Sequence, residues 1–328
     1  MIGLALGGGG VKGSYEIGAY CAFKKCHIKF DGITGTSIGS FNGAMIAAGL
    51  DKELLMFWQN ADVGKILGLD EKYVEKENLG IKDLELLKLK IDLVVSTLKN
   101  KGISTDGLEV VLKDFEIEPK LRKSKIDFGL STLRLNDQKH LDLFIKDIPE
   151  GALNNYLIAS CFFPVFRPKK LENDSYYFDG GIYNNCPVNM LLEKGYDKVY
   201  AIDLKAVGFR EKVIDEKRVI NIKPSRKLSG IFSVNKEEIN NNIKMGYYDT
   251  LKVLKRLDGN KYIFKRRPEV YYSILKRRLP KDFLEKNKTL NDRYLVIKFL
   301  EAYLDKNDKT YFNIYSPYKV LKECLSKK

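Results

Sequence analysis

The hydrophobic and polar positions of this 328-residue chain follow two patterns that alternate along most of its length. Short apolar or alternating runs predict strands, because a strand buries every residue or every second one. Segments with apolar residues three and four positions apart predict helices. Strands are expected at 2–6, 31–34, 126–133, 140–145, 176–179, 198–204 and 219–222, with helices at 14–23, 38–48, 152–163 and 237–257. This alternation predicts an α/β protein.

Two segments depart from the alternation. Residues 60–104 are expected to form a helical insertion that packs on the core or acts as a lid or lipid-facing surface, with apolar positions at Leu84, Leu87, Ile91, Val94 and Leu98. Residues 258–328 become rich in Lys, Tyr and Phe and predict a small helical appendage, with one helix at 292–305. The predicted organisation is an α/β domain over 1–257, followed by this basic appendage.

The net charge of +14 is unevenly distributed. Residues 205–328 hold 31 Lys and Arg against 15 Asp and Glu, whereas residues 1–204 hold 26 against 28. A basic surface of this kind is either a solvated face or a region attracted to anionic lipid or nucleic acid. No zinc-finger or RNP-type motif is present, so the sequence favours peripheral contact with an anionic membrane over nucleic acid.

Cysteine usage and the first residues bear on the compartment. The five cysteines have no C-x-x-C spacing, which indicates reduced thiols and predicts neither a disulfide framework nor a metal site. The opening run 1–6 lacks a basic region and leads into a glycine loop, so it predicts a first strand rather than a secretory signal. Apolar runs are too short to span a bilayer. We therefore expect a cytoplasmic protein that can bind a membrane peripherally.

The strongest chemical motif is Gly35-Thr36-Ser37-Ile38-Gly39, a G-x-S-x-G sequence. An apolar strand precedes it and a helix of small residues follows. In this context the serine occupies a sharp strand-to-helix turn, where flanking side chains would clash. The helix N-terminus also directs its positive dipole toward the serine. By itself the pentapeptide is also compatible with an ordinary serine in a tight turn.

A second motif is the glycine-rich run 7–13, which lies between the first strand and the first helix. Its free backbone N–H groups predict an anion site. The spacing Gly8-x-Gly10-x-x-Gly13, with Asp31 downstream, also matches a dinucleotide-binding fingerprint. A phosphate-binding P-loop fits less well because Lys12 precedes the last glycine. The third possibility is an oxyanion hole, which also accounts for a nucleophilic serine after the next strand.

A third motif is Asp179-Gly180-Gly181, which follows an aromatic strand. The aspartate is a candidate general base, although Asp-Gly turns are common. The two histidines, His27 and His140, both precede Asp179 and do not follow the Ser-Asp-His order of α/β-hydrolases. The economical mechanism is therefore a dyad of Ser37 and Asp179.

These three motifs, in this order and spacing, resemble the patatin-like phospholipase family over about residues 2–205. The runs 160–168 and 184–187 also resemble flanking patterns of that family. The resemblance implies a three-layer α/β/α sandwich with a mostly parallel sheet, and lipid acyl hydrolase activity without metal or cofactor. It implies Ser37 as nucleophile and Asp179 as its partner, an oxyanion hole at Gly8, Gly9 and Gly10, and supporting roles for Lys12, Gly35, Gly39, Gly180 and Gly181. Gly7 departs from the family, which often has Asp there.

Three other functions stay open from the sequence. The same acyl-enzyme could transfer its acyl group to an acceptor other than water. The glycine loop would also suit a dinucleotide-binding oxidoreductase, and the basic third a membrane-binding module without catalysis. The sequence does not indicate the head group, the acyl position or the oligomeric state.

Overall fold

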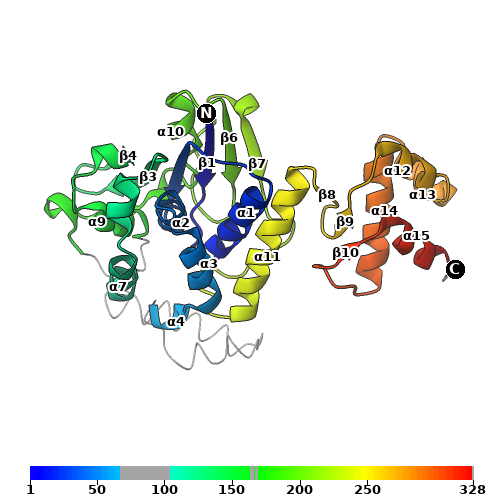
Figure 1. Cartoon of the computed structure of the whole chain (residues 1–328), viewed down its shortest axis with the longest axis horizontal. Helices are drawn as coiled ribbons and strands as arrows, with labels where there is room; N and C mark the ends of the chain where they lie inside the picture. The colour runs from blue at the N-terminus through cyan, green and yellow to red at the C-terminus, as the bar shows by residue number, and fades with distance from the viewer. Residues whose placement is uncertain (67–103, 163–165, 167–168, 327–328) are drawn as a thin grey trace. The chain divides into compact units, whose positions relative to one another are not determined.

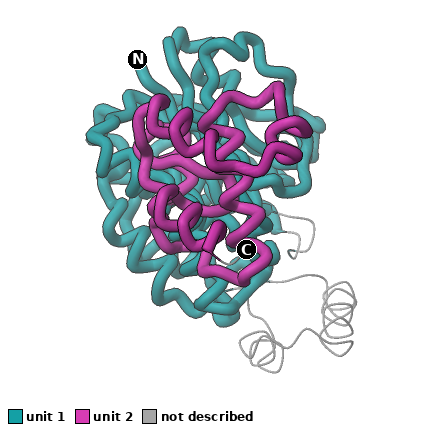
Figure 2. The backbone as a smooth tube through the Cα atoms, turned by 90° about the vertical axis from the view of Figure 1, so that its right-hand side faces the viewer, with its two compact units in different colours: residues 1–246 teal, residues 247–328 magenta. Residues whose placement is uncertain are grey.

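A computed structural model of the chain describes residues 1–66, 104–162, 166 and 169–326 (Figure 1). Most of the predicted insertion at 60–104 lies outside these residues. The chain divides into two compact units, Met1–Gly246 and Tyr247–Lys328 (Figure 2). The division falls inside a helix, α11 (Lys236–Val253), whereas the predicted boundary after residue 257 coincides with a short strand, β8 (Leu257–Asp258).

The first unit is built on one sheet, with strand order β4-β3-β2-β1-β6-β7 in the described part of the chain. The central neighbours are parallel, whereas β4 and β5 pair antiparallel with β3. Its strands are β1 (Ile2–Leu6), β2 (Gly32–Thr36), β3 (Asp127–Arg134), β4 (Lys139–Phe144), β5 (Tyr177–Asp179), β6 (Lys198–Ile202) and β7 (Val219–Ile222). The mostly parallel sheet that the resemblance implied is confirmed.

Helices cover both faces of this sheet (Figure 1). Helix α2 (Ile38–Ala47) packs on one face, where a Cβ at Gly43 would lie 3.1 Å from Ile33 and 3.4 Å from Phe128. Helix α10 (Val188–Glu193) packs on the other face, where Leu191 belongs to the same buried cluster as Ala5. The described helices of this unit also include α1 (Ser14–Lys25), α3 (Asp51–Asn60), α4 (Val63–Ile66), α7 (Asp106–Phe115), α8 (Ile117–Arg122) and α9 (Leu153–Ser160). The three-layer α/β/α architecture is therefore confirmed.

Burial on both faces explains the sequence pattern of the central strands. Leu4, Ala5 and Leu6 in β1 are all fully buried, as is Ile33 in β2. A strand covered by helices on both sides has no polar face, so it is a continuous apolar run rather than an alternating one. The edge strand β4 is only partly buried, and its sequence alternates polar and apolar residues from His140 to Leu143.

The second unit has its own small core. Helices α12 (Glu269–Lys276), α13 (Lys281–Lys286), α14 (Asp292–Lys306) and α15 (Pro317–Ser326) accompany a three-stranded sheet of β8, β9 (Ile263–Lys265) and β10 (Ile314–Tyr315). Buried Asp258 accepts a hydrogen bond from the Tyr272 hydroxyl at 2.7 Å and pairs with Arg293 at 2.8 Å. The predicted helices are confirmed, but the small sheet was not expected. Among the described helices of the whole chain, none is both long enough and apolar enough to cross a membrane.

Candidate active site

The register of β3 brings the ends of two other strands together. On one edge of β3, Ser131 pairs with Thr36, the last residue of β2. The next residue, Thr132, pairs with Asp179, the last residue of β5. Strands β2 and β5 therefore end at adjacent positions on the same neighbour. This arrangement places Ser37, which follows β2, next to Asp179.

Ser37 occupies a strained turn between β2 and α2. Its φ of 55° and ψ of −132° are values that a non-glycine residue rarely adopts, and they are typical of functional sites. The flanking glycines are required by close packing. A Cβ at Gly35 would lie 2.2 Å from the Gly39 carbonyl oxygen, and one at Gly39 would lie 2.6 Å from the Leu6 carbonyl oxygen.

Two serines hold this turn in place. The Ser37 N–H donates to Ser160 Oγ at 2.9 Å, and the Ser160 hydroxyl donates in turn to the Ser131 carbonyl oxygen at 2.8 Å. Ser40 Oγ donates to the Ser37 carbonyl oxygen at 2.6 Å. Ser160, at the end of α9, therefore ties the strained turn to β3. In the sequence, Ser160 is marked only by its place in the 160–168 run.

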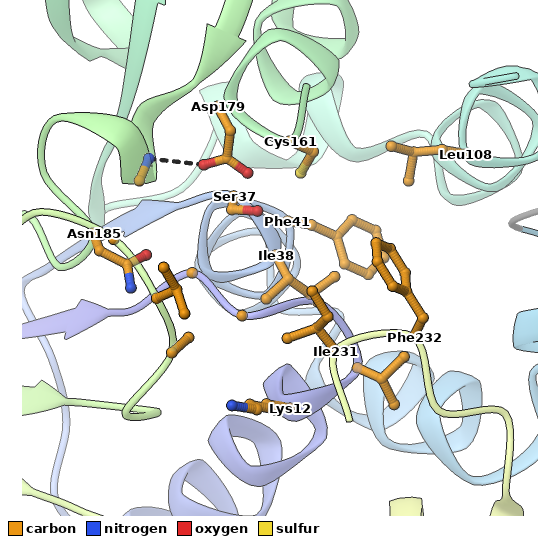
Figure 3. Close-up of a pocket in the computed structure, with 18 of the residues that line it drawn as sticks. Lys12, Ser37, Ile38, Phe41, Leu108, Cys161, Asp179, Asn185, Ile231 and Phe232 are labelled. Atoms are coloured by element: carbon orange, nitrogen blue, oxygen red, sulfur yellow. Dashed lines mark hydrogen bonds between the residues drawn. The ribbon is translucent and has the colours of Figure 1, made fainter. Parts of the chain in front are cut away.

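Asp179 lies beside Ser37 and is 5% exposed (Figure 3). Its Oδ1 accepts a hydrogen bond from the Gly181 N–H at 2.7 Å. Burial raises the pKa of Asp179 from 3.8 to about 6, although hydrogen bonds with the Ser37 side chain and the Gly181 N–H act in the opposite direction. The carboxylate therefore combines contact with a serine and a basicity closer to neutral pH than that of an exposed aspartate.

Neither histidine lines the cavity that contains these two residues. His27 lies in an exposed turn after α1. His140 lies on β4, where its Nε2 is 2.8 Å from Ser131 Oγ and its ring stacks on Tyr183 at 3.9 Å. Both histidines therefore lie outside the lining of the described cavity.

The glycine loop follows β1 and also lines the cavity. Gly8, which was expected among the oxyanion donors, instead donates its N–H to the Asn185 carbonyl oxygen at 2.9 Å. A Cβ at Gly8 would lie 3.0 Å from the Ser37 Cβ, so the loop passes directly beside the serine. Among the hydrogen bonds of the described residues, none uses the N–H of Gly9 or Gly10. These two N–H groups therefore have no acceptor among the hydrogen bonds of the described residues.

The cavity has a volume of about 520 Å³, within the range of small-molecule sites. Its walls are mostly apolar and include Ile38, Phe41, Phe57, Trp58, Leu108, Ile231 and Phe232. Lys12 also lies on this lining, and burial together with nearby Lys227 lowers its pKa. Such a cavity suits a long apolar chain that carries a polar group near Ser37.

The remaining predicted residues separate into two groups. Gly181 lines the cavity, as do Lys12 and the glycine loop. Gly35, Gly39 and Gly180 lie outside its lining and support the backbone behind it: a Cβ at Gly180 would lie 2.3 Å from the Ser131 carbonyl oxygen. Asn185 also lines the cavity, and its place in the 184–187 run was the one sequence signal for it.

The dinucleotide alternative required Asp31 to approach the glycine loop. Asp31 instead precedes β2, and its Oδ2 accepts the Ile2 N–H at 2.7 Å, where β1 begins. The glycine loop follows the opposite end of β1. The carboxylate therefore lies at the wrong end of the sheet to bind a ribose next to that loop. No group of three His, Cys, Asp or Glu among the described residues is arranged to hold a metal ion.

Taken together, the fold and the site define an α/β protein with a strained serine turn, a glycine loop and a buried carboxylate around one apolar cavity. The model of the patatin-like phospholipase family matches residues 4–192, more than half of the chain. The chain belongs to this family.

Curated relatives include lysophospholipase nte1 of Aspergillus terreus, 26% identical over 217 residues, and lysophospholipase NTE1 of Pyricularia oryzae, 27% identical over 210 residues. These matches cover 63% and 62% of this chain but only 12% of either relative. Among solved structures, VipD from Legionella pneumophila matches with a TM-score of 0.48 and 15% identity, over 93% of this chain and 76% of that one.

Proposed function

We propose that the protein is a serine lipid acyl hydrolase that cleaves fatty-acyl esters of phospholipids or lysophospholipids. The observation that carries the proposal is the pairing of Ser37 with buried Asp179 at an apolar cavity. Family membership and the names of the lysophospholipase relatives support a lipid substrate. The apolar walls would take the acyl chain.

In the proposed mechanism, Ser37 Oγ attacks the ester carbonyl carbon while Asp179 accepts the hydroxyl proton. The N–H groups of Gly9 and Gly10 stabilise the oxyanion of the tetrahedral intermediate. Collapse of the intermediate breaks the ester C–O bond, and Asp179 returns the proton to the departing alcohol. Asp179 then takes a proton from a water molecule that attacks the acyl-enzyme, the bond between the acyl carbon and Ser37 Oγ breaks, and Asp179 returns the proton to Ser37 Oγ as the fatty acid leaves.

We assign the positive charge of the C-terminal third of the chain to membrane contact. Residues 205–328 carry twice as many basic as acidic side chains, so an anionic surface would attract them. This attraction brings the enzyme to its substrate but does not orient the cavity. Orientation requires groups near the cavity itself.

The test is intact-mass analysis after treatment with a fluorophosphonate, combined with lysophospholipid hydrolysis. The wild type should gain one adduct and release fatty acid, whereas Ser37→Ala should do neither. Ser104→Ala is the matched control, because Ser104 lines the same cavity away from the strained turn and should still be labelled. Lipid hydrolysis that persists in Ser37→Ala would refute the proposal.

A further inference from the structure

A short loop after β6 exposes two apolar side chains to an unusual degree. Val207 is 97% exposed and Phe209 is 75% exposed. Ile182, which lies in the turn after Asp179, is 41% exposed. Single exposed apolar residues are common on protein surfaces, but adjacent ones beside a cavity mark interaction sites. We refer to Val207, Phe209 and Ile182 as the apolar rim.

The backbone of the apolar rim is held in place. The Phe209 N–H donates to the Gly181 carbonyl oxygen at 2.9 Å, and the Phe209 carbonyl oxygen accepts from the Asn185 N–H at 2.7 Å. Arg210 forms an ion pair with buried Asp203, which also accepts the Lys205 N–H at 2.7 Å. These bonds fix the loop, so the exposure of its apolar side chains is a property of the folded state.

The apolar rim belongs to the wall of the cavity that contains Ser37. Val207, Gly208, Phe209 and Ile182 all line that cavity. Gly208 permits the close approach, because its φ is 154° and a Cβ there would lie 2.6 Å from the Gly181 carbonyl oxygen. One continuous apolar surface therefore extends from the buried walls to the solvent at the rim.

We propose that the apolar rim inserts into a lipid surface and so seats the mouth of the cavity against the acyl chains of the layer. The inference rests on the proposed function for the identity of the substrate. Transfer of an apolar side chain from water to hydrocarbon lowers the free energy. The exposed side chains of the apolar rim can make this transfer without any change in the fold. Lys205 and Lys212, both exposed, flank the loop and complement the lipid phosphates.

Binding through insertion of the apolar rim differs from electrostatic attraction in its dependence on salt. Attraction by the basic residues weakens as the Debye length falls from about 10 Å at 0.1 M to about 3 Å at 1 M salt. Insertion of apolar side chains does not. We therefore expect sedimentation with phosphatidylcholine vesicles to persist at 1 M salt and to depend on the apolar rim.

The first experiment compares Val207→Ser/Phe209→Ser with Val270→Ser, which alters a valine that is 66% exposed in the second unit. The double variant should lose about tenfold in vesicle partitioning per side chain, or about 100-fold in all, whereas the control should bind as wild type does. Its hydrolysis of vesicle lipid should fall far more than its hydrolysis of a short soluble ester. Fluorophosphonate labelling reports that the variant is folded.

The second experiment places a fluorophore in the membrane. The chain has one tryptophan, Trp58, which is 4% exposed, so Val207→Trp adds a distinct signal. In a Ser37→Ala background, which preserves the vesicles, its emission should shift to the blue and be quenched by brominated acyl chains. Vesicle binding by the double variant equal to wild type, or an unshifted tryptophan, would overturn the inference. Insertion without Ser37 labelling would refute the proposed function instead.

Discussion

The burial of Asp179 leads to a prediction about the stability of the fold that can be tested without any substrate. A buried carboxylate pays a desolvation penalty, which is why burial raises the pKa of Asp179 to about 6. Replacement of Asp179 by Asn removes the charge and keeps the shape, including an oxygen able to accept the Gly181 N–H. We expect Asp179→Asn to inactivate the enzyme and to stabilise the fold at neutral pH.

The magnitude follows from proton linkage. Between pH 3.8 and about 6 the folded protein retains a proton on Asp179 that the unfolded chain has lost. The contribution of Asp179 to stability is therefore fully present below pH 3.8 and is lost as pH rises through 6. A rise in pKa from 3.8 to about 6 corresponds to roughly 3 kcal/mol. The variant should gain this much over wild type between pH 4 and pH 8.

The assay is denaturant unfolding of wild type and variant across that pH range. The difference between their free energies of unfolding cancels the other titrating groups. Asp137→Asn is the control, because Arg134 lowers the pKa of Asp137 to about 2, outside the range. Its difference from wild type should be flat. An Asp179→Asn difference that is also flat, or that falls with pH, would refute the assignment of a destabilising buried charge.

Three further outcomes are expected. The kcat/KM for a soluble ester should rise with pH through an acidic limb near 6, since Asp179 must be ionised to accept a proton; a limb near 4 would contradict this. Ser160→Ala should lower kcat by about tenfold with little change in KM, because it removes the acceptor of the Ser37 N–H. Leaving that buried N–H without a partner costs about 1–3 kcal/mol. An unchanged kcat would show that Ser160 does not position Ser37. Gly39→Ala should prevent folding, because its Cβ would lie 2.6 Å from a backbone carbonyl, whereas Gly195→Ala, strained by its φ of 86° but free of contacts, should still yield folded protein. Equal yields would show that the turn can relax.

Much of the fold could be predicted from the sequence because its signals are local. The strand expected at 126–133 is β3 at Asp127–Arg134, and the helix expected at 292–305 is α14 at Asp292–Lys306. The small sheet of the second unit could not be predicted in this way. Its strands β8 and β10 have two residues each, too few for any periodicity.

The candidate site likewise has one part that local sequence signals predict and one part that they do not. Ser37, Asp179 and the glycine loop were predicted because each belongs to a motif with a local backbone requirement. The bond from the Gly8 N–H to Asn185, which leaves Gly9 and Gly10 as the free donors, joins residues far apart in sequence. The apolar rim was also not predicted, because exposure depends on what the rest of the chain leaves uncovered.

One residue links the proposed catalytic carboxylate to the proposed lipid contact. The Gly181 N–H holds Asp179 Oδ1, and the Gly181 carbonyl oxygen holds the Phe209 N–H. A Cβ at Gly181 would lie 3.0 Å from Oδ1 of Asp179 and 3.0 Å from Oδ1 of Asn185, so any side chain there would press on both. A displacement of the apolar rim would therefore act on the turn that positions the carboxylate. Glycine at this position avoids pressing on either side chain, and so leaves both the carboxylate and the backbone bond to the apolar rim undisturbed.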